Sequence, residues 1–344
     1  MLTPFGIFSG WVNRSPGDLL NILSHSTHER HNAMLARTGH NFYFLPSAER
    51  HVWNKKNIDV PKNIQFIDKI EHNQRQLFDV IISQTLGQLS EDIKVAKAFN
   101  IPIILVHHCL RSATNVTSRK YWEQISKQCE VDYTVFITRS QAEDWWPDIW
   151  PNPVVIYHGV DTNVFDGWED INSKKYILNV TNDFIGRGQV MGWDTLQAVC
   201  ADLPVRCVGD TKHPNGTTFS LPANSLAELA QEYRSATVYF NVTRLSSIST
   251  SFLEAMATGV PCVTVDTFSI REFFNHEEHC LIFDEKDHDG MKTAIRAILD
   301  DPTKFKEMGL RARYRIMQIF SVENHVNQWN KLLYRVVNSK INPS

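Results

Sequence analysis

The sequence predicts an α/β protein built from two parallel-sheet domains, on the basis of its length, its composition and its pattern of apolar segments. The chain has 344 residues, which at about 150 residues per domain allows two domains. Hydrophobic residues make up 42% of the chain and charged residues 21%, a composition that excludes a disordered chain or a small disulfide scaffold. Short apolar runs alternate with segments of helical periodicity, which is typical of parallel α/β units.

The first half of the chain is expected to form one sheet with helices between its strands. A strand over 19–23 precedes a helix over 27–37, which we expect Gly39 to end. The run 101–106 is uniformly apolar, as central parallel strands are. The other expected elements are strands over 41–45, 64–67, 79–83 and 134–138 and helices over 90–99 and 121–128.

A proline-rich segment interrupts this pattern and marks the domain junction. Pro147, Pro151 and Pro153 lie close together, which no helix or central strand tolerates, so the junction is placed just after Pro153. The alternation then restarts with strands over 176–180, 205–208, 238–242, 262–265 and 280–283 and helices over 192–200, from 225, over 251–257, around 291–299 and over 322–337. Two successive parallel α/β halves predict a ligand cleft between them, at the carboxyl ends of their strands.

Charge and cysteine usage narrow the class of protein. The net charge of −3 argues against a protein that holds nucleic acid mainly by bulk charge. The six cysteines are scattered without C-x-x-C spacing, and we expect them to be buried and reduced. Residues 1–6 show no basic region followed by an apolar run, and no apolar stretch has the length of a membrane span. We therefore expect a cytoplasmic protein, with at most peripheral contact at the inner face of a membrane.

The most informative stretch runs from 244 to 261. It reads as a strand that ends in a hydroxyl-rich loop, which then enters a helix. Free backbone amides, the helix dipole and hydroxyl groups would converge there on an anion such as a diphosphate. Glu254 falls in the first turns of this helix, where its carboxylate could accept hydrogen bonds from a sugar diol. The structural alternative is a capping box between Ser251 and Glu254, with the serines merely ending the strand.

Segment 253–263 resembles the donor-site signature of the GT-B glycosyltransferases of the retaining family usually called family 4, or group 1. Segments 154–165 and 177–188 are similar to that family's interdomain phrase and to the first strand and loop of its donor domain. The resemblance extends over residues 154–337 and implies two Rossmann-like domains that face across a cleft. The acceptor-side domain would be 1–153, joined by the C-terminal helix 322–344, and the donor domain would be 154–321.

The resemblance also implies a donor site. The family glutamate that matches Glu254 binds the donor ribose, and Arg187 matches a diphosphate-binding lysine. A guanidinium suits phosphate at least as well, although the alternative for Arg187 is a solvated loop cation. Ser246 stands where the family has an earlier glutamate, and Asn182 replaces an arginine. The donor-binding residues are therefore expected to be Asn182, Arg187, Gly188, Ser246, Ser247, Ser249, Thr250 and Glu254.

The first half departs from the family where the acceptor should bind. The family's glycine-rich loop is replaced by residues 25–31, whose imidazoles, hydroxyls and guanidinium could contact phosphate or acceptor. We expect Thr27, His28 and Arg30 to be acceptor-side residues. The alternative for this segment is a capping box between Ser26 and Glu29.

Two adjacent histidines, His107 and His108, end the apolar strand of the first half. The resemblance makes His108 the residue nearest the transferred sugar. A hydrogen-bonded core histidine is the alternative for either ring.

The resemblance implies a retaining glycosyltransferase that moves a sugar from a UDP- or GDP-sugar to a hydroxyl of a glycan, a lipid-linked glycan or another acceptor. His108, Arg187 and Glu254 are expected to act in catalysis. We expect no metal and no cofactor beyond the co-substrate, and we interpret Asp289 of an Asp-His-Asp triplet as a helix cap. The alternatives are a sugar-nucleotide epimerase or hydrolase, a transferase that acts on a modified DNA base, and a nucleotide-sugar-binding protein without turnover.

Overall fold

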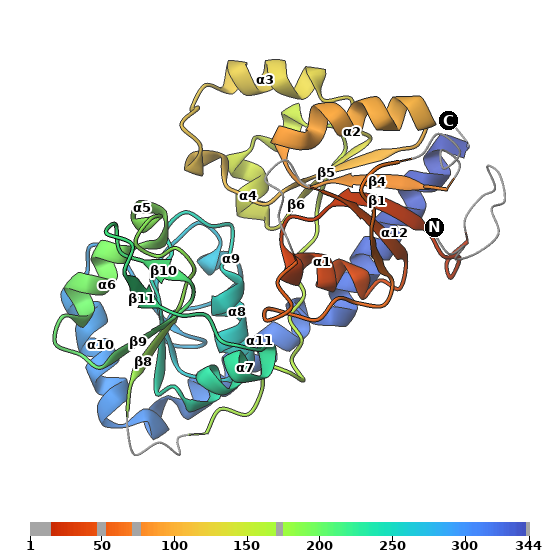
Figure 1. Ribbon diagram of the computed structural model, residues 1–344. Helices are drawn as coiled ribbons and strands as arrows, with labels where there is room; N and C mark the ends of the chain where they lie inside the picture. Colours follow the sequence, from red (N-terminus) through yellow and green to blue (C-terminus); the bar gives the residue numbers. More distant parts are fainter. Residues whose placement is uncertain (1–14, 47–52, 71–76, 170–174, 342–344) are drawn as a thin grey trace.

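The computed structural model describes residues 15–46, 53–70, 77–169 and 175–341, so the expectation about residues 1–6 lies outside the described part. Figure 1 shows two α/β domains, with the long C-terminal helix lying against the first domain. The first sheet is parallel throughout, in the order β3-β2-β1-β4-β5-β6-β7. Its strands are β1 (Asn21–His25), β2 (Asn41–Leu45), β3 (Ile64–Phe66), β4 (Val80–Ser83), β5 (Ile103–His107), β6 (Tyr133–Phe136) and β7 (Pro153–Val155).

Helices connect the strands of this sheet. They are α1 (Glu29–Ala36), α2 (Leu86–Phe99), α3 (Arg119–Gln128) and α4 (Arg139–Asp144). Gly39 follows α1 with a φ of +87°, the left-handed conformation expected of a glycine that ends a helix. Strand β7 was not expected, because prolines surround it. Pro153 is tolerated there as the first residue of an edge strand, and the strand carries the first sheet on to Val155.

The second sheet is also parallel, in the order β14-β13-β12-β8-β9. Its strands are β8 (Ile177–Val180), β9 (Val205–Val208), β12 (Val238–Asn241), β13 (Cys262–Val265) and β14 (Leu281–Phe283). A separate antiparallel hairpin is formed by β10 (Thr211–Lys212) and β11 (Thr218–Ser220). The helices of the second domain are α5 (Gly188–Met191), α6 (Trp193–Cys200), α7 (Leu226–Ser235), α8 (Thr250–Thr258), α9 (Ile270–Phe273), α10 (His288–Asp300) and α11 (Lys306–Ile319). Short 3₁₀ turns occupy Arg111–Ala113, Pro147–Ile149 and Pro302–Phe305.

The chain crosses between the domains twice, and the two crossings lie side by side. The amide of Val160, on the first crossing, donates to the carbonyl of Phe320, on the second, at 2.7 Å. Helix α12 (Val322–Ile341) then packs against the first domain, where the Tyr334 hydroxyl donates to the carbonyl of Asp18 at 2.9 Å. Two adjacent chain segments therefore connect the domains, and a hinge motion of one domain against the other would be centred there.

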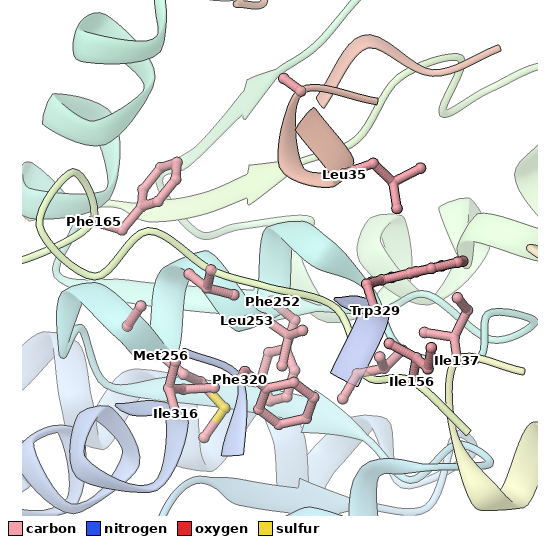
Figure 2. Packing of buried hydrophobic residues seen from close by; sticks show 14 of the residues in the cluster. Leu35, Ile137, Ile156, Phe165, Phe252, Leu253, Met256, Ile316, Phe320 and Trp329 are labelled. Atoms are coloured by element: carbon pink, nitrogen blue, oxygen red, sulfur yellow. The ribbon is translucent and has the colours of Figure 1, made fainter. Parts of the chain in front are cut away.

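Apolar packing is continuous across this junction. Trp329 of α12 is 1% exposed and belongs to a cluster drawn from both domains. Figure 2 shows this cluster, with Leu35, Ile137, Ile156 and Trp329 on one side and Phe252, Leu253, Met256, Ile316 and Phe320 on the other. This packing joins the two domains beside the two connecting segments.

The predictions about cysteines and membrane spans can be compared with this fold. All six cysteines are free thiols, and four of them, Cys129, Cys200, Cys262 and Cys280, are buried as expected, whereas Cys207 is half-buried and Cys109 is exposed. Burial raises the pKa of the Cys200 and Cys280 thiols to about 12, which keeps them protonated. Among the helices of the described residues, none is both long and apolar enough to cross a bilayer.

Candidate donor site at the domain interface

Two loops of the second domain meet at the carboxyl ends of the neighbouring strands β8 and β12. The amides of Arg244 and Leu245, after β12, both donate to the carbonyl of Val190, in α5 after β8, at 2.9 and 3.2 Å. The backbones approach so closely that a Cβ on Gly192 would lie 2.0 Å from the carbonyl oxygen of Val242, and Gly192 has a φ of +75°. Only glycine fits there, so residues 187–192 and 244–249 form one continuous surface.

The two arginines on this surface have different surroundings. Arg244 is held in place by Asp194 at 2.7 Å and by Glu285 at 2.8 Å. Arg187 is exposed, and its guanidinium makes no hydrogen bond or ion pair to the residues that the structure describes. Arg187 is therefore the arginine of this surface that is available to an anion, whereas Arg244 holds the loop in place.

Helix α8 begins at this surface with its first amides uncapped by side chains. Ser249 is the N-cap residue, yet within the described part of the chain its hydroxyl makes no capping hydrogen bond. It pairs instead with the Ser251 hydroxyl at 2.8 Å, which also accepts from the Tyr239 hydroxyl at 3.0 Å. The alternative of a Ser251–Glu254 capping box is therefore wrong. The free amides and the helix dipole together favour an anion at this point.

The remaining donor-site candidates surround this helix start. Ser247 is buried, Ser246 is half-buried and Thr250 is exposed. Asn182 is exposed as well, and its side-chain oxygen accepts from the amide of Asp210 at 2.9 Å. That bond gives Asn182 a structural role in the loop after β8. Gly188 begins α5, directly after Arg187.

Glu254 is 3% exposed and lies against the first domain. Its Oε2 accepts a hydrogen bond from the Tyr233 hydroxyl at 3.1 Å. Its Oε1 forms an ion pair with the guanidinium of Arg30, which comes from α1 of the other domain. Burial raises the pKa of Tyr233 well above its ordinary value, so this hydroxyl remains a neutral donor. Both carboxylate oxygens of Glu254 are thus in contact with protein donors.

The start of α1 differs from the expected capping box. His28 is the N-cap residue, and its Nδ1 accepts from the amide of His31 at 3.4 Å. Glu29 accepts instead from the amide of Asn54 at 2.9 Å, so the Ser26–Glu29 capping box is wrong. An imidazole can replace the usual hydroxyl or carboxylate because its unprotonated nitrogen is also an acceptor.

The three acceptor-side candidates share this segment but differ in their surroundings. The Thr27 hydroxyl donates to Gln84 at 2.8 Å, and His28 is exposed. Arg30 points into the domain interface, toward Glu254. Thus Arg30 contacts the second domain, and nothing in the sequence around Arg30 indicated this contact.

The two histidines after β5 have opposite surroundings. His107 is buried among aromatic rings, 4.3 Å from Trp145 and 5.1 Å from Phe136 between centroids, as a core histidine would be. His108 is half-buried and meets His31 edge to face, with centroids 4.6 Å apart. Burial, and then the neighbouring His28, lower the pKa of His108 to about 4, so its ring is neutral at neutral pH.

His31 also lies beside His158 of the interdomain segment, with ring centroids 6.1 Å apart. The sequence did not indicate that His31 contacts His108 and His158. It also did not indicate that Tyr233 is a hydrogen-bond partner of Glu254. No local signal identifies either residue, because each acts through a contact distant in sequence.

The Asp-His-Asp triplet is structural. Asp287, rather than Asp289 as expected, caps helix α10, accepting from the amide of Gly290 at 2.9 Å. Asp289 lies in the first turn, where the helix dipole favours an acidic residue. Within the described residues, no group of three or more His, Cys, Asp or Glu side chains could hold a metal ion.

Residues 193–331 match the family model described as glycosyl transferase-like. A stretch of 85 residues is 32% identical to the N-acetyl-alpha-D-glucosaminyl L-malate synthase of Bacillus anthracis. This match covers 25% of the chain and only 22% of that relative.

The fold is similar to that of two solved structures. One is sucrose-phosphate synthase from Thermosynechococcus elongatus, with a TM-score of 0.73 and 15% identity over 93% of this chain and 100% of that chain. Another is Anabaena HepE in complex with UDP, with a TM-score of 0.71 and 12% identity over 92% of this chain and 100% of that chain.

Two facing parallel-sheet domains with this structural likeness define the GT-B fold of glycosyltransferases. Within that fold class, residues 193–331 are similar to the glycosyl transferase-like family, which agrees with the resemblance seen in the sequence.

Proposed function

We propose that the chain is a retaining glycosyltransferase that transfers a sugar from a UDP- or GDP-sugar to an acceptor hydroxyl. The observation that carries the proposal is that an available guanidinium, an uncapped helix start and a buried carboxylate belong to one side of the interface. Arg187 and the start of α8 suit a diphosphate, and Glu254 suits a ribose diol. The similarity to HepE, whose complex holds UDP, supports the same donor class.

Arg187 and the α8 amides would stabilise the departing diphosphate as its negative charge develops. The α8 amides are held in place by the helix and need no reorganisation at the moment of reaction, and for this reason they can lower the barrier. In the proposed step, the bond from the anomeric carbon to the diphosphate oxygen breaks while the acceptor oxygen bonds to the same face of that carbon. The acceptor proton passes to the departing phosphate oxygen. This route needs no cofactor beyond the co-substrate.

His108 is the proposed first-domain residue nearest the sugar. Its ring is neutral at neutral pH, since burial and His28 lower its pKa to about 4. A neutral imidazole can donate one hydrogen bond to a sugar hydroxyl and accept another. We extend the proposal to a glycan or lipid-linked glycan acceptor and to a cytoplasmic site of action.

The test is to incubate the full chain with a panel of UDP-, GDP- and ADP-sugars, with and without candidate acceptors. We expect nucleotide release that depends on the acceptor and a product whose anomeric configuration, read by NMR, is that of the donor. Release without an acceptor would indicate a hydrolase, and sugar interconversion an epimerase. An inverted product would contradict the retaining mechanism, and binding without turnover would contradict transfer.

Variants test the site itself. Arg187→Ala should weaken donor binding by about tenfold or more, because hydrogen bonds to charged groups contribute roughly 1.5–3 kcal/mol. Glu254→Gln should weaken it too, since the amide keeps only one acceptor oxygen. Arg296→Ala is the matched control, because Arg296 is exposed and pairs with Asp202 away from the interface. Unchanged donor affinity in both site variants would refute the assignment.

A further inference from the structure

The ion pair between Arg30 and Glu254 connects the two domains at the proposed donor site. Arg30 belongs to α1 of the first domain and Glu254 to α8 of the second. The Arg30 side chain is 25% exposed and that of Glu254 is 5% exposed. Salt therefore screens this pair much less than a surface pair.

Neighbouring groups fix the geometry of the pair. The guanidinium of Arg30 lies 5.6 Å from the centroid of the ring of Phe165, a residue of the interdomain segment 154–165 that is labelled in Figure 2. A guanidinium over an aromatic face is favoured electrostatically. Tyr233 holds the second oxygen of Glu254 from within the donor domain. The carboxylate is thus positioned by its own domain, and its other oxygen is bound by a cation from the opposite domain.

We propose that Arg30 and the ribose diol of the nucleotide donor compete for the Glu254 carboxylate, so that Arg30 sets donor affinity. This inference rests on the proposed function. A diol must reach the carboxylate oxygens to bind them, and Glu254 is only 3% exposed, with a protein partner on each oxygen. One of these partners must therefore move aside before a diol can enter. The neutral hydroxyl of Tyr233 can stay beside the diol, whereas the charged fork of Arg30 must leave Oε1. Donor entry then breaks this contact between the two domains.

The competition has a calculable effect. An apparent dissociation constant equals the intrinsic one divided by the fraction of protein competent to bind. If the pair is formed about nine-tenths of the time, donor affinity is reduced about tenfold. Other contacts keep the domains together meanwhile, among them the bond between the Thr138 and Ser269 hydroxyls at 2.7 Å. Loss of the Arg30 contact therefore opens one side of the interface without separating the domains.

The test is nucleotide binding to the full chain, measured by titration calorimetry with UDP, GDP and ADP. Arg30→Met removes the charge and keeps an unbranched stem, and it should bind the preferred nucleotide about tenfold more tightly than the unaltered protein. Arg30→Lys keeps the charge without the planar fork and should fall between the two. The matched control is Arg37→Met: Arg37 follows the same helix and pairs across to Asp161 at 3.4 Å, away from Glu254. Its nucleotide affinity should not change.

A dideoxynucleotide sharpens the result. 2′,3′-Dideoxy-UDP lacks the diol, so the gain in Arg30→Met should shrink toward none. An equal gain for UDP and its dideoxy form would overturn the competition, since Arg30 would then act on another part of the nucleotide. The competition would also be overturned if both Arg30 variants bound nucleotide with unchanged or weaker affinity while the unaltered protein binds it. If folded protein binds no nucleotide in any form, the proposed function itself fails, and the competition with it.

Discussion

The rings of His31 and His108 meet edge to face with centroids 4.6 Å apart, which places a helix start and a strand end of the first domain in direct contact. His158 also lies beside His31, with ring centroids 6.1 Å apart. The Nδ1 of His325 donates to the carbonyl of Tyr157 at 2.6 Å. Burial, and then neighbouring imidazoles, lower the pKa of His158 to about 3. Burial lowers that of His325 to about 4.

This cluster predicts loss of stability in mild acid. The folded-state pKa values lie below the ordinary value of 6.5, so as pH falls from 6.5 toward 4 the unfolded chain takes up protons first. For each proton that the unfolded chain binds and the folded protein does not, the free energy of unfolding falls by about 1.4 kcal/mol per pH unit. His158→Asn should make the free energy of unfolding fall less steeply between pH 6.5 and 4, as measured by urea denaturation. His213→Asn, at an exposed site, is the control, and equal slopes in both variants would contradict the prediction.

A second prediction concerns the contact between α8 and α11. A Cβ on Gly309 would lie 2.1 Å from the carbonyl oxygen of Gly259, which ends α8. Since the backbone of α8 must move to relieve this clash, Gly309→Ala should lower the free energy of unfolding by about 1–3 kcal/mol. Gly87 lies in the first turn of α2, where an added Cβ would meet no atom within 4 Å, so Gly87→Ala should be neutral or slightly stabilising. In thermal unfolding, Gly309→Ala should have a lower melting temperature than Gly87→Ala. Equal melting temperatures would show that α8 and α11 can move apart to accommodate the methyl group without loss of stability.

Glu272 makes a third contact that can be tested. Its two carboxylate oxygens accept from the amides of Arg139 and Ser140, at 3.1 and 3.0 Å, and so cap α4 from the other domain. Glu272→Ala should therefore speed hydrogen exchange at these two amides, which mass spectrometry of the peptide over 138–145 would detect. Glu277→Ala removes an exposed carboxylate near by and should leave that peptide unchanged. Slow exchange retained in Glu272→Ala would mean that the α4 start is protected without the cap.

Local signals predicted the fold well. The strands over 41–45 and 262–265 have the bounds expected from their apolar runs, because a buried parallel strand is apolar on both faces. The loop before α8 was likewise visible in sequence, since hydroxyl residues before a helix start form a local pattern. Strand β7 was missed because prolines normally exclude a strand.

The cross-domain part of the site was not predictable in this way. Arg30 and Glu254 are far apart in sequence, and nothing near either residue specifies the other. The histidine cluster likewise combines α1, the end of β5, the interdomain segment and α12. Such contacts depend on how two finished domains dock, whereas hydrophobic periodicity and capping patterns report only on the element that contains them.

The last prediction concerns the other partner of Glu254. Tyr233 and Tyr239 are both fully buried, and each hydroxyl donates one hydrogen bond, to the Glu254 carboxylate at 3.1 Å and to the Ser251 hydroxyl at 3.0 Å. A hydrogen bond to a charged group contributes roughly 1.5–3 kcal/mol and one between neutral groups about 1 kcal/mol. Tyr233→Phe should therefore lower the free energy of unfolding in urea by about 2 kcal/mol and Tyr239→Phe by about 1 kcal/mol. Because both variants lose one buried hydroxyl, the difference between them reports the charge of the acceptor, the Glu254 carboxylate. A larger loss in Tyr239→Phe than in Tyr233→Phe would mean that this carboxylate is protonated or does not accept from Tyr233.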